Sequence, residues 1–444
     1  MDEISPKKSH ISDKNVSPFE PNMEEIGSTV SLDLSQDVTN ASPVLPLPKE
    51  DLTAWIQVFG AFFLNLNTWG LMSAYGQFQT FYQLELLTSQ SPSNISWIGS
   101  TQAFLMFLTS IIAGPIFDAG YVNTLLWTGS LLTVLGMCLT SICKEYWQVF
   151  LTQGIIMGVG FGLMYLPAPA VIAQYFHKRS ALAMIMSSTG TAIGGIIYPI
   201  TFAQLQPRIG FGWATRVLAF IILSTSLVPL AVMKPRIKTS TKRIFIDASA
   251  FRDVPYMLLN LGNLFGFMGL NIILYYIQLY ALEESSVSPA LASYLLVIIN
   301  ASSLIGRLIS GLCVDRLGPV NVQTAVVLSS AVLTFCLLAI KNPPGLVVYS
   351  ALYGISAGPF MGLPSAGVVR ISPDPSKFGI RIGMTLAFVG FGVLVSNPIA
   401  GALLADRGRW TGLIVWCGGL LAAASVSMAA SRIAKVGIKL SSVL

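Results

Sequence analysis

Long apolar stretches with almost no charge recur from Ala54 to Ala430, and short polar breaks separate them. A helix needs about 20 mostly apolar residues to cross the hydrocarbon core of a bilayer. The pattern predicts an all-α polytopic membrane protein with twelve transmembrane helices. Their expected bounds are Ala54–Tyr75, Ile95–Ile116, Val122–Ile142, Val149–Ala173, Ala181–Phe202, Trp213–Met233, Tyr256–Leu279, Pro289–Cys313, Val320–Ile340, Gly345–Val369, Gly379–Leu403 and Thr411–Ser431.

The overall composition supports a membrane protein. The mean hydropathy is +0.69, 53% of the residues are hydrophobic and 10% are charged, whereas a soluble protein carries about 25% charged residues. A soluble helical protein would need polar faces on these helices, and the stretches have none. The sequence therefore argues against a soluble fold.

Residues 1–50 form a polar arm that is rich in Ser, Pro, Asp and Glu. Because it has no apolar period, we expect it to be disordered. It lacks a basic start followed by an apolar core, so it does not resemble a secretory signal peptide. The first membrane helix is then expected to direct insertion.

Basic residues indicate which ends of the helices face the cytoplasm. With a cytoplasmic N-terminus, the inside loops, Lys49 and the C-terminal tail together carry sixteen Lys and Arg, and the outside loops carry five. Because positive charge is enriched on the cytoplasmic side, both termini are predicted to be cytoplasmic. The plasma membrane is favoured over an internal membrane. Asn94-Ile95-Ser96 is a glycosylation sequon outside the first helix pair, so Asn94 is a candidate site close to the membrane.

The chain divides into two six-helix halves that echo each other. A basic cytoplasmic linker, residues 234–255, separates an N-terminal bundle, 51–233, from a C-terminal bundle, 256–431, and 432–444 form a tail. Gly114-Pro-Ile-Phe-Asp118 follows the second helix, and Gly311-Leu-Cys-Val-Asp315-Arg316 follows the eighth. Matching motifs in two halves indicate a duplicated unit, which is the architecture of secondary transporters.

The repeated Gly-x-x-x-Asp-(Arg)-x-x-Gly element resembles the loop signature of the major facilitator superfamily. The resemblance implies the major facilitator fold and a latch for alternating access formed by Asp118, Asp315 and Arg316. The first copy departs from the family, because Ala119 stands where a basic residue is expected after Asp118.

Two longer motifs resemble the fungal branch of the monocarboxylate porter family within that superfamily. One is Asn67-Thr68-Trp69-Gly70 with Tyr75-Gly76 in helix one, and the other is Gly194-Gly195-Ile-Ile-Tyr198-Pro199 in helix five. The resemblance covers roughly residues 50–430 and implies carriage of a small organic molecule. The binding Arg of the proton-coupled members matches Arg307, but their Asp and Lys positions fall at Ser303 and near Ser73. The resemblance therefore does not imply that this protein transports lactate together with protons.

Arg307 is the charged residue that interrupts an apolar run, Tyr294–Cys313. A charge at that depth costs at least about 2.5–3.5 kcal/mol and usually faces a cavity. Arg307 could anchor a substrate carboxylate or phenolate. Alternatively, it could reach toward lipid headgroups or Asp315 at the cytoplasmic end of the helix.

The other substrate-binding candidates are polar or aromatic residues on helices expected to line a central cavity. They are Asn65, Trp69, Tyr75, Asn263, Asn271, Tyr275 and Ser303. Asn65 and Trp69 are one turn apart and share a helical face. The alternative role for these residues is hydrogen bonding between helices, which helps membrane helices to pack.

The sequence argues against an enzyme, because it has no Gly-x-Ser-x-Gly elbow, no His-Glu-x-x-His motif and no phosphate-binding loop. Two histidines and five scattered cysteines make a metal site unexpected, and no cofactor is predicted. The expected partners are a small-molecule substrate and the lipid bilayer. No nucleic-acid partner is expected, and the protein is expected to be a monomer.

The sequence thus favours a secondary transporter that moves a monocarboxylate-like anion or a fungal metabolite by alternating access. Import and export are both compatible with these residues. A non-transporting nutrient receptor of the same fold is the alternative, and the short cytoplasmic extensions argue against it. A channel would show a polar stripe through many helices, which these stretches lack.

Overall fold

The computed structural model describes residues 51–176, 179–236, 247–285, 287–373, 377–405 and 410–437. These residues are helical and contain no strand. Nine continuous helices among them are long and apolar enough to cross a membrane. The predicted polar arm lies outside the described residues.

The first membrane segment is a broken helix. It comprises α2 (Leu52–Asn65), η1 (Leu66–Gly70), α3 (Leu71–Ser73), α4 (Tyr75–Phe81) and η2 (Tyr82–Leu86). It is therefore longer than the expected span Ala54–Tyr75. The wide turns of η1 and η2 are local π-helical insertions, which are frequent at functional sites.

The rest of the N-terminal half contains α5 (Pro92–Asp118), α6 (Val122–Thr140), a segment built from α7 (Tyr146–Val149), η3 (Phe150–Ile156), α8 (Met157–Tyr165) and α9 (Pro167–Tyr175), and α10 (Ser180–Val232). The structure differs from the expected pair Ala181–Phe202 and Trp213–Met233, because α10 runs through both. Its backbone leaves the helical region at Gly210, with φ 78° and ψ 166°. Glycine tolerates this conformation because it has no Cβ, so α10 makes two spans joined by a kink.

The second half repeats this order after a short helix, η4 (Ala248–Arg252). It contains α11 (Val254–Glu284), α12 (Pro289–Leu317), α13 (Pro319–Cys336) with η5 (Leu337–Ala339), α14 (Pro343–Ala357), η6 (Gly358–Met361), α15 (Leu363–Ile371), α16 (Phe378–Ala405) and α17 (Trp410–Val436). A bend of 43° separates Pro343–Met361 from Leu363–Ile371. If α10 is counted as two spans, the bent pair as one and the broken first segment as one, the described chain has twelve spans.

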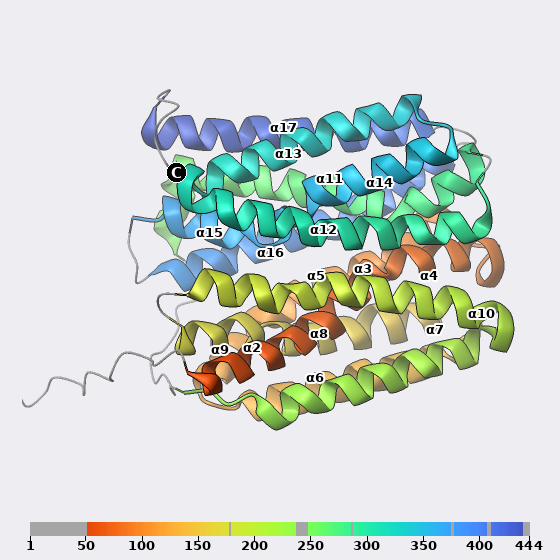
Figure 1. Ribbon diagram of the computed structural model, residues 1–444, viewed down its shortest axis with the longest axis horizontal. Helices are drawn as coiled ribbons and strands as arrows, with labels where there is room; N and C mark the ends of the chain where they lie inside the picture. Colours follow the sequence, from red (N-terminus) through yellow and green to blue (C-terminus); the bar gives the residue numbers. More distant parts are fainter. Residues whose placement is uncertain are drawn as a thin grey trace, which may run out of the picture. The chain divides into compact units, whose positions relative to one another are not determined.

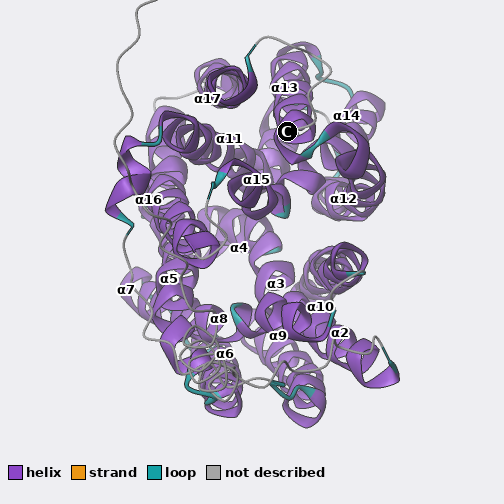
Figure 2. Ribbon diagram, turned by 90° about the vertical axis from the view of Figure 1, so that its left-hand side faces the viewer, coloured by secondary structure: helices purple, strands orange, loops and turns teal. Residues whose placement is uncertain are grey.

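Figures 1 and 2 show the described helices side by side in two groups, with α2 to α10 in one and α11 to α17 in the other. Large side chains such as Tyr198, Phe202, Tyr353 and Phe360 are buried inside, whereas many Leu, Ile and Phe side chains on the outer faces are exposed. An apolar exterior is what a bilayer requires of its spanning helices. The structure is thus a polytopic bundle of two six-helix halves.

Candidate substrate-binding site

Arg307 lies on α12 and connects the two halves. Its Nη1 donates to the backbone oxygen of Ser188 on α10 at 2.7 Å, and its Nε donates to that of Gly358 in η6 at 3.3 Å. None of the described carboxylates forms an ion pair with it. A guanidinium has five N–H donors, so donors are left over for a ligand, and its charge has no neutralising partner among the described side chains.

Ser303 is one turn from Arg307 and is buried beneath η6. Its hydroxyl donates to the oxygen of Asn300 on its own helix at 2.7 Å. A Cβ built on Gly358 would lie 2.6 Å from the Cβ of Ser303. The glycine therefore allows η6 to approach α12, and this approach places the Gly358 carbonyl within reach of Arg307.

Asn65 of α2, in the N-terminal half, contacts α10 at the residue next to the one that Arg307 contacts. Its Nδ2 donates to the oxygen of Ser187 at 3.2 Å, and the next carbonyl, that of Ser188, accepts from Arg307. Two predicted residues from opposite halves are thus brought to adjacent carbonyls of one helix. The contact of Asn65 is an interhelical hydrogen bond, which is the alternative role that the sequence left open.

A row of aromatic rings crosses between the halves next to η6, the short helix that Arg307 contacts. Trp69 packs edge-on against Phe107 with ring centroids 5.7 Å apart, Phe107 lies 6.1 Å from Phe267, and Phe267 lies 5.0 Å from Phe360. Trp69 also meets Tyr165 at 5.9 Å. Phe360 belongs to η6, the short helix whose Gly358 binds Arg307. Sequence reasoning identified Trp69 but missed the three phenylalanines, because they stand in uniformly apolar stretches with no distinguishing motif.

Tyr75 and Tyr275 pair with each other where α4 meets α11. Their ring centroids are 4.8 Å apart, and the Tyr75 hydroxyl donates to the Ile95 oxygen at 3.0 Å. Both rings press on Gly99, where a Cβ would lie 2.5 Å from Tyr75 and 2.6 Å from the Tyr275 hydroxyl. These two candidates therefore pack between the halves.

The asparagines of α11 have different surroundings from each other. Asn263 accepts a hydrogen bond from Gln323 of α13 at 2.6 Å, whereas Asn271 donates to the Phe267 oxygen of its own helix at 2.8 Å. Asn271 thus stays beside the aromatic row, and Asn263 ties two helices of the second half together. Although both were predicted to bind substrate, the two asparagines share no hydrogen-bond partner among the described residues.

The end of the bundles opposite the linker is closed by uncharged groups from both halves. Ser93 of α5 donates to the Pro398 oxygen of α16 at 2.8 Å, Asn397 donates to Ser100 at 3.3 Å, and the Ser96 hydroxyl bonds that of Tyr276. A Cβ on Gly401 would lie 2.6 Å from the Ser93 nitrogen. Backbone contact of this kind between the halves seals that end.

A charged cluster stands near the linker, and sequence reasoning had counted its residues only as loop charges. Arg381 of α16 binds Asp247 at 3.2 Å and Asp253 at 2.6 Å, and Lys377 binds Asp247 at 3.2 Å. Hydrogen bonds from Ser249, Lys377 and Arg381 hold the pKa of Asp247 well below its usual range. The cluster fastens η4 and the start of α11 to α16.

The predicted latch and glycosylation residues are only partly described. Asp118 ends α5 and Asp315 lies near the end of α12, but their side chains are outside the described part; Arg316 is exposed in the last turn of α12. Asn94 is exposed, and its Nδ2 donates to the Gln90 side chain at 3.1 Å. The latch and the glycosylation site therefore stay predictions.

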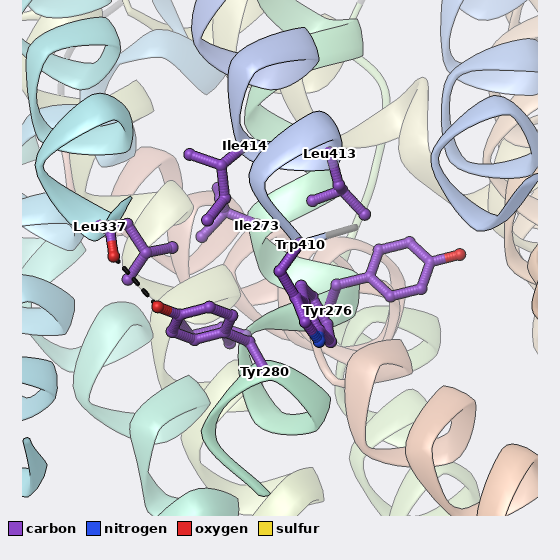
Figure 3. Close-up of a pocket in the computed structure, with 8 residues that line it drawn as sticks. Ile273, Tyr276, Tyr280, Leu337, Trp410, Leu413 and Ile414 are labelled. Carbon is purple, nitrogen blue, oxygen red and sulfur yellow. Dashed lines mark hydrogen bonds between the residues drawn. The ribbon is translucent and has the colours of Figure 1, made fainter. Parts of the chain in front are cut away.

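One small hollow lies among α11, α17 and η5 (Figure 3). Tyr276, Tyr280, Leu337 and Trp410 are among its lining residues, and the Tyr280 hydroxyl donates to the Leu337 oxygen at 3.0 Å. Its volume is about 10 Å³, which is at the lower limit for one water molecule. It is too small for a substrate.

Two bundles of membrane helices joined around a half-buried arginine define a multi-spanning carrier. The family model of the Major Facilitator Superfamily matches residues 57–344 and 259–436, and the chain belongs to this superfamily.

Several fungal relatives are similar over most of their length. The MFS-type transporter dbaD of Emericella nidulans is 42% identical over 369 residues, 83% of each chain. The Aspyridones efflux protein apdF of the same fungus is 34% identical over 85% of this chain and 78% of its own. The Agnestins efflux protein AgnL12 of Paecilomyces divaricatus is 33% identical over 86% and 87%.

Solved structures share the fold at low sequence identity. A mutant of the peptide transporter POT superposes with a TM-score of 0.70 at 11% identity, covering 88% of this chain and 98% of its own. A mutant of the nucleoside transporter NupG gives 0.67 at 14%, covering 85% and 99%. The solved structures support the major facilitator fold, and the fungal relatives support a secondary transporter.

Proposed function

We propose that this chain exports a small organic anion made by fungal metabolism, with Arg307 as the anchor for the negative group. The observation that supports this proposal is that Arg307 sits within a membrane-spanning helix, and that its hydrogen-bond partners among the described residues are the uncharged backbone oxygens of Ser188 and Gly358. An unneutralised charge at such depth is costly and usually serves a substrate or ion pathway. A carboxylate or phenolate would neutralise it through charge-assisted hydrogen bonds.

The direction of transport follows from the relatives. Two of them are named efflux proteins, for aspyridones and agnestins. Export of a fungal metabolite is therefore the proposed role, within the monocarboxylate porter branch that the helix-one and helix-five motifs resemble. The receptor alternative gains no support, because the relatives reported above are named transporters or efflux proteins.

The proposed binding groups are of two kinds. Arg307 supplies charge, and Trp69 with the neighbouring phenylalanines supplies flat apolar surface for a substrate ring. Asn65, Asn271 and Ser303 surround these groups, while Tyr75, Tyr275 and Asn263 support the helices that carry them. Asp118, Asp315 and Arg316 form the proposed latch at the linker end.

The proposed topology places the linker and both termini in the cytoplasm, in the plasma membrane, with the protein acting as a monomer. The sixteen-to-five distribution of basic residues supports this orientation. The bundles are taken as 51–233 and 256–431 with the linker 234–255 between them, and Asn94 is the proposed glycosylation site on the outside.

Transport in vesicles that contain the purified protein tests this proposal. We expect counterflow of a labelled aromatic carboxylate or polyketide by the native protein and a loss of about 10- to 100-fold in Arg307→Ala, the scale of a lost charged hydrogen bond. Arg307→Lys should retain part of the activity, since lysine keeps the positive charge but lacks the planar, two-pronged set of N–H donors of a guanidinium. Lys341→Ala, which removes an exposed basic residue at the opposite end, is the matched control.

The result can contradict the proposal in two ways. Normal counterflow by a folded Arg307→Ala protein would remove the anchor role. Absence of counterflow for every anion by the native protein would favour a receptor. A pH gradient applied across the same vesicles shows whether protons are coupled despite Ser73 and Ser303 at the family's Lys and Asp positions.

A further inference from the structure

A larger hollow lies beside the charged cluster, between η4, α11 and α16. Its volume is about 200 Å³, and its walls include Phe251, Met257, Met384, Ala387 and Phe391. Phe251 and Phe391 are each 59% exposed, so the hollow opens at the outer surface of the bundle. It is separate from the surroundings of Arg307, which are built by α10, α12 and η6.

Most of the lining is hydrocarbon and thioether, and its two residues with polar side-chain groups are Tyr256 and Asn260. Water is held in cavities that offer it several polar partners, whereas apolar cavities of about 150 Å³ stay dry and take up apolar molecules. A hollow of this size and lining therefore suits an apolar chain.

The charged cluster forms one edge of the hollow. The guanidinium of Arg381 lies 5.1 Å from the centre of the Tyr256 ring, and Tyr256 is one of the lining residues. Arg381 and Lys377 already engage the carboxylates of Asp247 and Asp253. The acidic groups at this edge are therefore compensated.

With Lys377 and Arg381 balancing these two carboxylates, Arg252 of η4 is a further positive charge next to the hollow. Arg252 directly follows the lining residue Phe251, is exposed, and forms no ion pair with a described carboxylate. The side chain of Lys377 is 37% exposed beside Asp247. An apolar slot beside an element that carries an excess positive charge is complementary to an anionic amphiphile.

We propose that this hollow binds one acyl chain of an anionic phospholipid, whose phosphate meets Arg252 and Lys377. The inference rests on the proposed orientation, which puts η4 at the cytoplasmic leaflet, where anionic lipids are concentrated. Bound there, the lipid fills the space between α11 and α16 and braces the attachment of η4.

The test is lipid retention, measured by native mass spectrometry of the purified full-length protein in detergent with equal phosphatidylserine and phosphatidylcholine. We expect one retained phosphatidylserine in the native protein. Ala387→Trp fills the hollow and should abolish retention, whereas Ala325→Trp, at an exposed position on α13, should not. Arg252→Ala should cut the preference for phosphatidylserine about five-fold, and Lys435→Ala, an exposed base on α17, should leave it unchanged.

Three outcomes would overturn the proposal: unchanged retention in Ala387→Trp, no retained lipid in the native protein, or equal retention of both lipids with no effect of Arg252→Ala. Displacement of the lipid by an uncharged apolar metabolite alone would assign the hollow to a different ligand. Because the measurement needs no transported substrate, its failure is independent of a failure of the export proposal in the counterflow assay.

Discussion

Arg307 and Arg381 show how differently one residue type can be held within the same fold. Arg381 is 3% exposed and binds two carboxylates, with its guanidinium over the Tyr256 ring. Within the part of the chain that the structure describes, Arg307 donates to the carbonyls of Ser188 and Gly358 and forms no ion pair. A carboxylate neutralises a buried charge and a carbonyl does not. We therefore assign Arg381 a structural role, whereas the charge of Arg307 can still be neutralised by a bound anion.

Removal of Arg381 should destabilise the protein strongly. Arg381→Ala leaves two largely buried carboxylates, Asp247 and Asp253, without their main partner, and breaking a buried pair in this way costs about 3–5 kcal/mol. The melting temperature in detergent measures the effect. Lys377→Ala removes an exposed partner of Asp247 and should cost less than about 1 kcal/mol; equal effects of the two changes would contradict the assigned role.

The same cluster predicts a dependence of stability on acidity. The pKa of Asp247 is lowered by hydrogen bonds from Ser249, Lys377 and Arg381, so its carboxylate stabilises the folded state fully above the unfolded value of about 3.9. This contribution should be constant between about pH 5 and 8 and should diminish below about pH 4. Melting curves of native protein and Asp247→Asn check this, since the variant should lose stability at neutral pH and show a shallower acid decline.

At the scale of elements, corresponding helices of the two halves begin in the same way. Ser91-Pro92 opens α5 and Ser288-Pro289 opens α12, and each serine accepts from the backbone nitrogen three residues on. Such caps are local, so they could be read from the sequence. The breaks in the first segment could not be predicted, because packing against neighbouring helices decides where π turns form. The continuity of α10 could not be predicted either, because it depends on the backbone conformation of one residue, Gly210.

The close approach of α4 to α11 gives a prediction about closure. A side chain at Gly76 would overlap the Leu274 oxygen, so Gly76→Leu should hold the end opposite the linker open and abolish counterflow. Labelling of a cysteine placed at Ser93 by an impermeant thiol reagent should increase in that background. Gly419→Leu on α17, where nothing lies within 4 Å, is the control, and unchanged labelling in Gly76→Leu would argue against closure at this seam.

At the scale of the whole molecule, hydrophobic period and charge were enough to predict the twelve-span bundle. The candidate site was less accessible. Arg307 could be identified because a charge in an apolar run stands out, and Asn65 because it is polar there. Phe107, Phe267 and Phe360 could not, because their meeting depends on how segments more than 90 residues apart are brought together. Asn263 was a candidate because it is polar, and the structure gives it the interhelical hydrogen bond with Gln323 of α13 that was its alternative role.

The closed end of the bundle has a consequence for how transport experiments can be interpreted. Hydroxyls, an amide and backbone oxygens hold the seam of Ser93, Ser96, Ser100, Asn397 and Tyr276, and no ion pair among the described residues crosses it. Interactions between such neutral groups are not titrated near neutrality and are little affected by ionic strength. A change of transport rate with pH or salt would therefore report on the cargo, on its driving ion or on the charged groups at the linker end, and not on the strength of this closure.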